Sequence, residues 1–178
     1  MSTIEITPTK VAAGSYNADP AHSHVEFGIR HMKISTIHGR FLTYEARLEG
    51  GEQPRISGSI STDSAVTDDE QRDAHIKGAD FFDVERYPQA TFQGTLVAPD
   101  RVEGEVTLKG VTKPVTLSAK VTGPDNDPWG NERVGIELEG EVNRLDHGVN
   151  WNAPLPGGGF LLDDTVKLSA SLSFVKEA

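Results

Sequence analysis

The sequence contains no cysteine among its 178 residues. Disulfides, thiolate nucleophiles and cysteine-ligated metal centres are therefore excluded. No apolar run approaches the length of a membrane span, and the first 20 residues, which carry Glu5, lack an apolar stretch as long as that of a signal peptide. These absences lead us to expect no membrane insertion and a location in the cytoplasm.

Basic residues are also scarce, with 17 Lys and Arg against 27 Asp and Glu, which gives a net charge of −10. A protein that grips a phosphate backbone needs clustered basic side chains, so we expect no nucleic-acid partner. Apolar residues make up 36% and charged residues 25%, as in globular proteins. We predict one domain over 1–178, with 1–14 as a loosely ordered N-terminal extension.

Most of the chain alternates apolar and polar residues, which is the period of a β-strand with one buried face. Eight segments follow this pattern: 23–31, 42–49, 55–61, 90–98, 101–108, 115–121, 134–142 and 165–175. The apolar parity changes close to Phe41, so we expect a bulge or bend near Phe41–Thr43.

A helical segment at about 68–84 interrupts the strand pattern. Thr67 or Asp68 can cap its first turn, and Gly78 is placed to end it. Asp80 can cap a second short helix that carries two phenylalanines. A further irregular region, 143–160, ends in three glycines and is expected to be a mobile loop.

Eight antiparallel strands with single apolar faces can form either a sandwich or a closed barrel. An eight-stranded barrel encloses just enough space for its side chains or for one small ligand. Several apolar faces carry Gly or Ala, such as Ala46, Gly94, Gly140 and Ala170. These small residues predict either an underfilled interior that forms a pocket or tight bends at barrel corners.

Three histidines lie within residues 22–31, where they raise the possibility of a metal site. His31 shares its strand face with apolar side chains, whereas His24 lies on the opposite face and His22 precedes the strand. In a regular strand the three cannot converge on one metal ion. We interpret His22 as bonded to the turn and His24 as solvated. His31 is either a satisfied core histidine or a polar contact for a ligand.

Arg72, His75 and Ile76 share one face of the predicted helix because they lie three and four residues apart. Ile76 indicates that this face meets the barrel. One interpretation is structural, with Arg72 and Asp73 forming ion pairs inside the helical segment. The other is functional, with Arg72 and His75 beside the barrel mouth, where they contact a phosphate, carbonyl or quinone oxygen.

Several motifs together resemble the YceI-like lipid/polyisoprenoid-binding family. They are, in chain order, YNADPAHSHVEFGIRHM, STIHGRF, RDAHIKGADFFDVERYPQATF, VTLKGVTKPV, DPWGN and NRLDHG. The resemblance implies a lipocalin-like antiparallel barrel whose lumen holds a polyisoprenoid, a quinone-like chain or a fatty amide. It also implies a possible homodimer. His147 stands where the family more often has an aromatic residue, which we expect to alter one end of the pocket.

Our prediction is an all-β, eight-stranded, antiparallel, lipocalin-like barrel that is not an enzyme. It binds a long-chain apolar small molecule as a carrier, store or scavenger. No cofactor is expected beyond a bound isoprenoid-type lipid or quinone. The candidate ligand-binding residues lie on the inward strand faces and the helical segment, and are Val25, Phe27, Ile29, His31, Tyr44, Arg72, His75, Phe81, Phe82, Phe92, Val106, Leu117, Ile136 and Leu168.

Two other hypotheses remain open at this point. The first is a metal-assisted or general acid/base enzyme that uses His22, His31, His75 and Asp73, and it requires these side chains to converge. The second is an interaction module with a filled barrel, which predicts no internal cavity.

Overall fold

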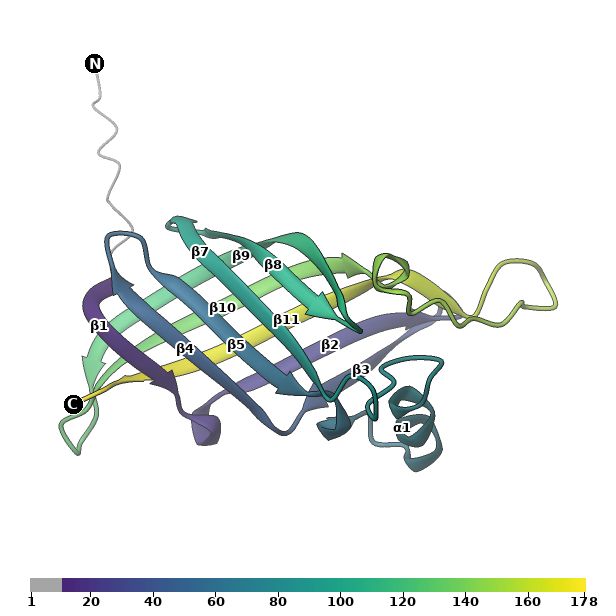
Figure 1. Cartoon of the computed structure of the whole chain (residues 1–178), viewed down its shortest axis with the longest axis horizontal. Helices are drawn as coiled ribbons and strands as arrows, with labels where there is room; N and C mark the ends of the chain where they lie inside the picture. The colour runs from purple at the N-terminus through teal and green to yellow at the C-terminus, as the bar shows by residue number, and fades with distance from the viewer. Residues whose placement is uncertain (1–10) are drawn as a thin grey trace, which may run out of the picture.

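The computed structural model describes residues 11–178, which form eleven β-strands, one α-helix and three short 3-10 helices (Figure 1). Residues 1–10 of the expected N-terminal extension lie outside the described part. Residues 11–14, also expected there, form the start of the first strand. The chain therefore enters the sheet earlier than its small, weakly patterned residues indicate.

The strands are β1 (Val11–Ala18), β2 (His24–His31), β3 (Ser35–Phe41), β4 (Tyr44–Gly51), β5 (Arg55–Ser61), β6 (Ala65–Val66), β7 (Gln89–Ala98), β8 (Arg101–Leu108), β9 (Val111–Asn126), β10 (Glu132–Asn143) and β11 (Leu162–Lys176). The α-helix is α1 (Glu70–Lys77), and the 3-10 helices are η1 (Pro20–His22), η2 (Thr62–Ser64) and η3 (Arg144–His147).

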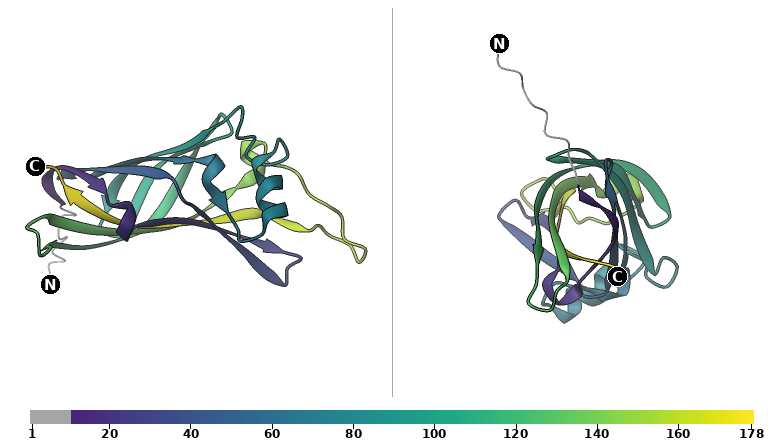
Figure 2. Two further views of the ribbon diagram at one scale, coloured as in Figure 1. Left: turned by 90° about the horizontal axis from the view of Figure 1, so that it is seen from below. Right: turned by 90° about the vertical axis from the view of Figure 1, so that its left-hand side faces the viewer.

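Eight antiparallel strands close into a barrel in the order β1-β4-β5-β7-β8-β9-β10-β11, with β11 returning to β1. Strands β2, β3 and β6 lengthen this barrel at one end. Strand β2 continues the course of β1 after η1 and pairs with β11 and β3, while β6 pairs with β3. The end view in Figure 2 shows the ring. The predicted eight-stranded barrel is confirmed, although β1, β3 and β6 were not predicted as strands.

The expected bend near Phe41–Thr43 separates β3 from β4. Leu42 points outward and is 59% exposed. The amide of Leu42 donates to the carbonyl of Ser64 at 3.2 Å, and the amide of Thr43 donates to the Ser64 hydroxyl at 3.0 Å. The parity of the apolar residues therefore changes between β3 and β4, and the amides of Leu42 and Thr43 remain hydrogen-bonded at the bend.

The helix is shorter than predicted. Its N-cap is Asp69, whose carboxylate accepts from the amide of Arg72 at 3.0 Å, and it ends at Gly78 as expected. The second helix predicted after Asp80 is absent. The segment 79–87 forms hydrogen-bonded turns instead, including an amide of Phe82 that donates to the carbonyl of Ile76 at 3.0 Å.

The barrel end nearest the C-terminus is filled by its own side chains. Tyr16, Leu48, Ile136 and Phe174 have no exposed surface and pack with the apolar residues of β5, β7 and β8. Val134 and Phe174 are cross-strand partners in this cluster. We call this packed region the closed end.

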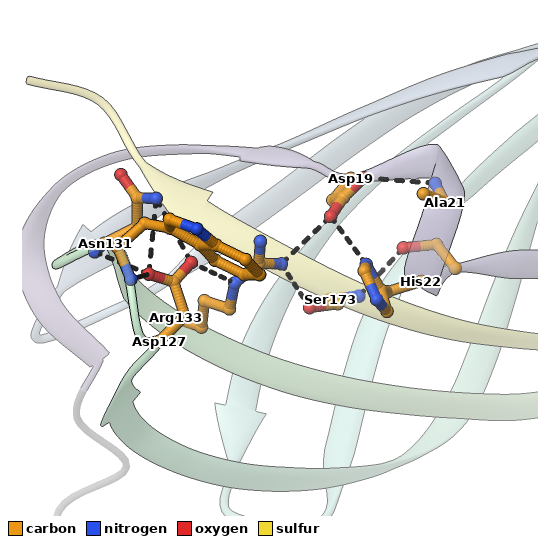
Figure 3. Close-up of polar contacts among 9 residues, drawn as sticks. Asp19, Ala21, His22, Asp127, Asn131, Arg133 and Ser173 are labelled. Atoms are coloured by element: carbon orange, nitrogen blue, oxygen red, sulfur yellow. Dashed lines mark hydrogen bonds and ion pairs between the residues drawn. The ribbon is translucent and has the colours of Figure 1, made fainter.

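A polar network braces the closed end (Figure 3). The guanidinium of Arg133 donates from Nη1 to Asp19 Oδ2 at 3.0 Å and from Nε to Asp127 Oδ2 at 2.9 Å. The pKa of Asp127 is lowered by the backbone amide of Asn131 and by Arg133. The pKa of Asp19 is lowered by His22 and by Arg133. The network joins the start of η1 to the turn between β9 and β10.

Candidate functional site

An elongated cavity of about 570 Å³ occupies the barrel between the closed end and α1. This volume lies in the usual range for small-molecule sites. The walls come from the inward faces of nearly all strands and are mainly apolar. The filled-barrel hypothesis predicted no cavity, so this structure contradicts it.

The inward-facing residues of β10 show how far the cavity extends along the barrel. Along β10 the lining residues are Leu138, Val142 and, just beyond the strand, Arg144. The preceding inward residue, Ile136, belongs to the packed closed end. The six-residue rise from Leu138 to Arg144 corresponds to about 20 Å of strand. The cavity is therefore long, and Arg72 and His75 of α1 line it together with Arg144.

One wall is a cluster of three phenylalanines. The ring centroid of Phe27 lies 5.2 Å from that of Phe41 and 6.3 Å from that of Phe82. Phe27 lies over Gly39 on the neighbouring strand, where an added Cβ would come within 2.1 Å of the Phe27 ring. Gly39 is therefore needed for this ring position, because any larger residue would displace Phe27.

The cavity mouth is narrowed by three rings that we call the mouth cluster. His75 of α1 lies 5.0 Å from Phe81 and 4.8 Å from Trp151, measured between ring centroids. Phe81 and Trp151 are 5.5 Å apart. His75 Nε2 is also 3.0 Å from the carboxylate of Asp80. The cluster joins the helical segment to the loop that follows η3.

Arg72 and Asp73 hold α1 to the preceding loop through Thr67. The guanidinium of Arg72 donates to both the hydroxyl and the carbonyl of Thr67, each at 2.7 Å. Asp73 accepts from the amide of Thr67 at 2.7 Å. The expected ion pairs of Arg72 and Asp73 inside the helical segment are therefore wrong, although Arg72 does line the cavity.

Arg144 is the most deeply buried cation in the cavity wall and is only 3% exposed. Its Nε donates to the carbonyl of Asp163, and its Nη1 donates to the carbonyls of Val149 and Trp151, at 2.7–2.8 Å. Its Nη2 has no hydrogen-bond partner among the described residues, and Asp164 lies 4.0 Å away. Burial lowers the pKa of Arg144, while the charge of Asp164 raises it.

These contacts leave Nη2 of Arg144 as a buried N–H group without an acceptor among the described residues. An unpaired buried donor is unfavourable, so an acceptor placed there would be strongly bound. Sequence reasoning missed Arg144. The only signal was a basic residue between a β-strand and Gly148 in the NRLDHG motif.

Tyr44 contributes a second buried polar atom to the wall. Its hydroxyl lacks a well-formed hydrogen bond among residues 11–178. Burial raises the pKa of this hydroxyl, and the neighbouring Ser23 side chain lowers it in part. Tyr44 was predicted to line the pocket, and the structure places it there.

The histidines do not converge. His22 Nδ1 lies 2.8 Å from Asp19 outside the barrel, His24 is exposed, and His31 lines the cavity. His75 contacts Asp80 and the mouth cluster. Within the described chain, no group of three or more potential ligands is placed to hold a metal ion. This arrangement does not support the enzyme hypothesis.

His147 also differs from its expected role. It is buried, and its Nδ1 lies 2.9 Å from the carbonyl of Val111. It is not part of the cavity lining, so the expectation that it alters one end of the pocket is wrong.

All the predicted binding residues except Ile136 line the cavity; they are Val25, Phe27, Ile29, His31, Tyr44, Arg72, His75, Phe81, Phe82, Phe92, Val106, Leu117 and Leu168. Their role in binding stays a prediction. Ile136 shares the inward face of β10 but lies in the closed end, where no space remains. Alternation along a strand predicts which side chains point inward but not how far the lumen is filled.

Comparison with known proteins places this barrel in a family. The YceI-like domain matches residues 16–174, which is nearly the whole chain. This chain belongs to the YceI-like family. The YceI protein of Shigella flexneri is 38% identical over 147 residues, or 77% of each chain. A Staphylococcus aureus relative is 32% identical over 165 residues, covering 90% of this chain and 96% of its own length.

Solved structures share the fold of this YceI-like chain. BcnA of Burkholderia cenocepacia superposes with a TM-score of 0.73 at 21% identity, covering 88% of this chain and 98% of BcnA. A polyisoprenoid binding domain from Saccharophagus degradans gives a TM-score of 0.67 at 14% identity, covering 91% of this chain and 98% of that domain. Within residues 11–178, no helix has the length and apolar character needed to cross a membrane. The cytoplasmic location and the homodimer stay predictions.

Proposed function

We propose that this YceI-like protein binds a polyisoprenoid, an isoprenoid quinone or a related lipid in its lumen, as a carrier, store or scavenger. The observation that carries the proposal is the long, largely apolar cavity, closed at one end and narrowed by the mouth cluster at the other. The likeness of this fold to a polyisoprenoid binding domain supports the ligand class.

Burial of a hydrocarbon chain supplies enough free energy for this role. Each buried methylene contributes about 0.8 kcal/mol, so about ten of them contribute roughly 8 kcal/mol. This gross gain corresponds to about micromolar affinity, and the ordering of the ligand offsets part of it, so more than about ten buried methylenes are needed to reach that affinity. Such a cavity selects mainly by length and girth.

A polar head group would lie toward the mouth. Arg144 and His31 both line the cavity, and Nη2 of Arg144 has no hydrogen-bond partner among the described residues. A quinone, phenol, alcohol or carboxylate oxygen would satisfy the buried donor of Arg144. No catalytic step is needed, because binding and release complete the proposed activity.

Displacement of diphenylhexatriene, an apolar dye that fluoresces in dry surroundings, tests the proposal. We expect its fluorescence to rise with this protein and to fall when polyprenols of increasing length are added. Affinity should increase with polyprenol length until the chain exceeds the cavity. A dye signal that does not rise, or that polyprenols do not reduce, would overturn the proposal.

A further inference from the structure

We propose that the open end of the barrel docks on a lipid bilayer through two neighbouring loops. These docking loops are the β2–β3 turn, residues 32–34, and the loop 154–160 before β11. The inference rests on the proposed function, because an apolar cargo is found in membranes and must enter and leave the cavity. The docking is peripheral and involves side chains at loop tips.

The docking loops expose large apolar side chains next to one another. Ile34 is 76% exposed, Phe160 60% and Met32 42%. The amide of Met32 donates to the carbonyl of Leu161 at 2.8 Å, which ties the turn to the loop. Figures 1 and 2 show both segments together at the α1 end of the barrel, with the loop projecting farthest. Neighbouring exposed apolar groups are typical of interaction surfaces.

The β2–β3 turn has a strained backbone conformation that asparagine and glycine adopt more easily than methionine and lysine do. Met32 and Lys33 have φ angles of 56° and 58°, and the amide of Ile34 donates to the carbonyl of His31 at 3.1 Å. This is the two-residue hairpin geometry that Asn-Gly adopts most easily. A thioether and an ammonium therefore occupy the tip at the expense of local stability, as is common at functional positions.

Charge also distinguishes the docking loops from the rest of the chain. Residues 151–162 carry no charged side chain, and the β2–β3 turn adds Lys33 beside Arg30, whereas the whole chain has a net charge of −10. Lys and Arg at a surface are attracted to anionic lipids. Helix α1, which carries acidic residues, lies against the barrel in the left view of Figure 2, and the docking loops project beyond it. The loops thus present the surface best suited to an anionic bilayer.

A second protein molecule fits this surface less well than a bilayer does. Stable protein interfaces bury about 800 Å² on each partner, from 20 to 30 residues a side. Three apolar side chains on two projecting loops are too few to form such a flat contact. Shallow insertion of these tips into an interface is how peripheral proteins with Phe and Lys bind membranes. The mouth cluster lies at the same end, so docking would bring the cavity mouth to the lipid.

Sedimentation with vesicles tests the inference. The probe is phosphatidylcholine vesicles containing one-quarter phosphatidylglycerol, and the variant is the full chain with Met32→Ser, Ile34→Ser and Phe160→Ser. We expect the partition coefficient of this triple variant between vesicles and buffer to fall about tenfold or more, because the apolar area that inserts into the bilayer is lost. The matched control is Trp129→Ser, which removes an 80% exposed side chain at the opposite end and should leave partition unchanged.

A charge variant separates lipid charge from apolar insertion. Lys33→Glu should weaken binding to the anionic vesicles more than to vesicles of pure phosphatidylcholine. Equal effects on both kinds of vesicle would overturn the charge argument. The docking inference itself fails if the unmodified protein sediments with neither kind of vesicle. It also fails if the triple variant and the unmodified protein sediment equally with the anionic vesicles.

Two further measurements keep the inference distinct from the proposed function. Diphenylhexatriene binding without vesicles should be equal in the triple variant and the unmodified protein, which also shows that the variant is folded. If the unmodified protein does not bind diphenylhexatriene, the proposed function is overturned, whatever the result with vesicles. A dimer in light scattering that the triple variant abolishes would assign the loops to a second copy of this chain and overturn docking.

Discussion

The indole of Trp151 lies 4.8 Å from the imidazole of His75, measured between ring centroids and at 84° between ring planes. This edge-to-face contact joins two segments that are remote in sequence. It spans the mouth of the cavity, and Phe81 completes the cluster. We therefore expect release of a bound ligand to require separation of α1 from the loop that follows η3.

Replacement of Trp151 by alanine should open the mouth. Such aromatic contacts contribute about 0.5–1.5 kcal/mol each, so we expect the dissociation rate of a bound apolar dye to rise about tenfold when both are lost. Stopped-flow fluorescence after mixing with excess vesicles measures this rate. Trp129→Ala is the control, since Trp129 lies outside the cavity lining. An unchanged rate in Trp151→Ala would contradict a gating role for the mouth cluster.

Filling the cavity from within should abolish binding. Ala170 of β11 lines the lumen beside Leu138 and Val25, its cross-strand neighbours. Ala170→Phe places a ring in the space that the ligand would occupy, and we expect affinity to fall at least about tenfold. The adjacent residue gives a matched control, because Ser171→Phe points to the outer face. Equal losses in a dye titration of both variants would show that binding does not take place in the lumen.

His31 should distinguish ligands by their head groups. His31→Phe removes a polar ring from the cavity wall, so it should weaken a long-chain alcohol about two- to tenfold but spare a hydrocarbon of equal length. Competition with diphenylhexatriene measures both affinities. His24→Phe, on the opposite face of β2, should change neither of them. Equal losses for alcohol and hydrocarbon with His31→Phe would rule out a polar anchor at this position.

The network at the closed end predicts a pH-dependent contribution to stability. The pKa values of Asp19 and Asp127 are lowered in the folded state. Their stabilisation is therefore complete above the unfolded pKa near 3.8 and is lost as the pH falls through the lower folded values. Arg133→Gln should lower the thermal midpoint by several degrees at neutral pH.

The difference between Arg133→Gln and the unmodified protein should then shrink as the pH falls below about 4. Circular dichroism melts across this range measure it. Arg101→Gln, which removes an exposed pair with Glu103, should have little effect at any pH. A constant difference down to the lowest pH would show that Arg133 stabilises by packing alone.

The alternation of strand β2 predicted one cavity wall correctly. Val25, Phe27, Ile29 and His31 share a parity, and the structure places all four in the lining. A strand has only two faces, so local sequence is enough to assign them. The phase change at Phe41 likewise predicted the break between β3 and β4.

Other features depend on contacts that a linear pattern does not contain. Ile136 points inward as predicted, yet whether an inward residue faces ligand or core depends on side chains from other strands, here Tyr16 and Phe174. Arg144 of η3 and Trp151 of the loop that follows it line the cavity, and the guanidinium of Arg144 donates to the carbonyl of Trp151. Irregular segments lack a period from which such placement can be inferred.

Native mass spectrometry of the protein purified from its own host, followed by solvent extraction of any bound species, tests the central claim most directly. The proposed function predicts an added mass of several hundred daltons that extracts into organic solvent and contains an isoprenoid chain. The same mass should be missing from Ala170→Phe and present in Ser171→Phe. A ligand-free mass for the unmodified protein, or one raised only by a metal ion, would contradict the lipid-binding account.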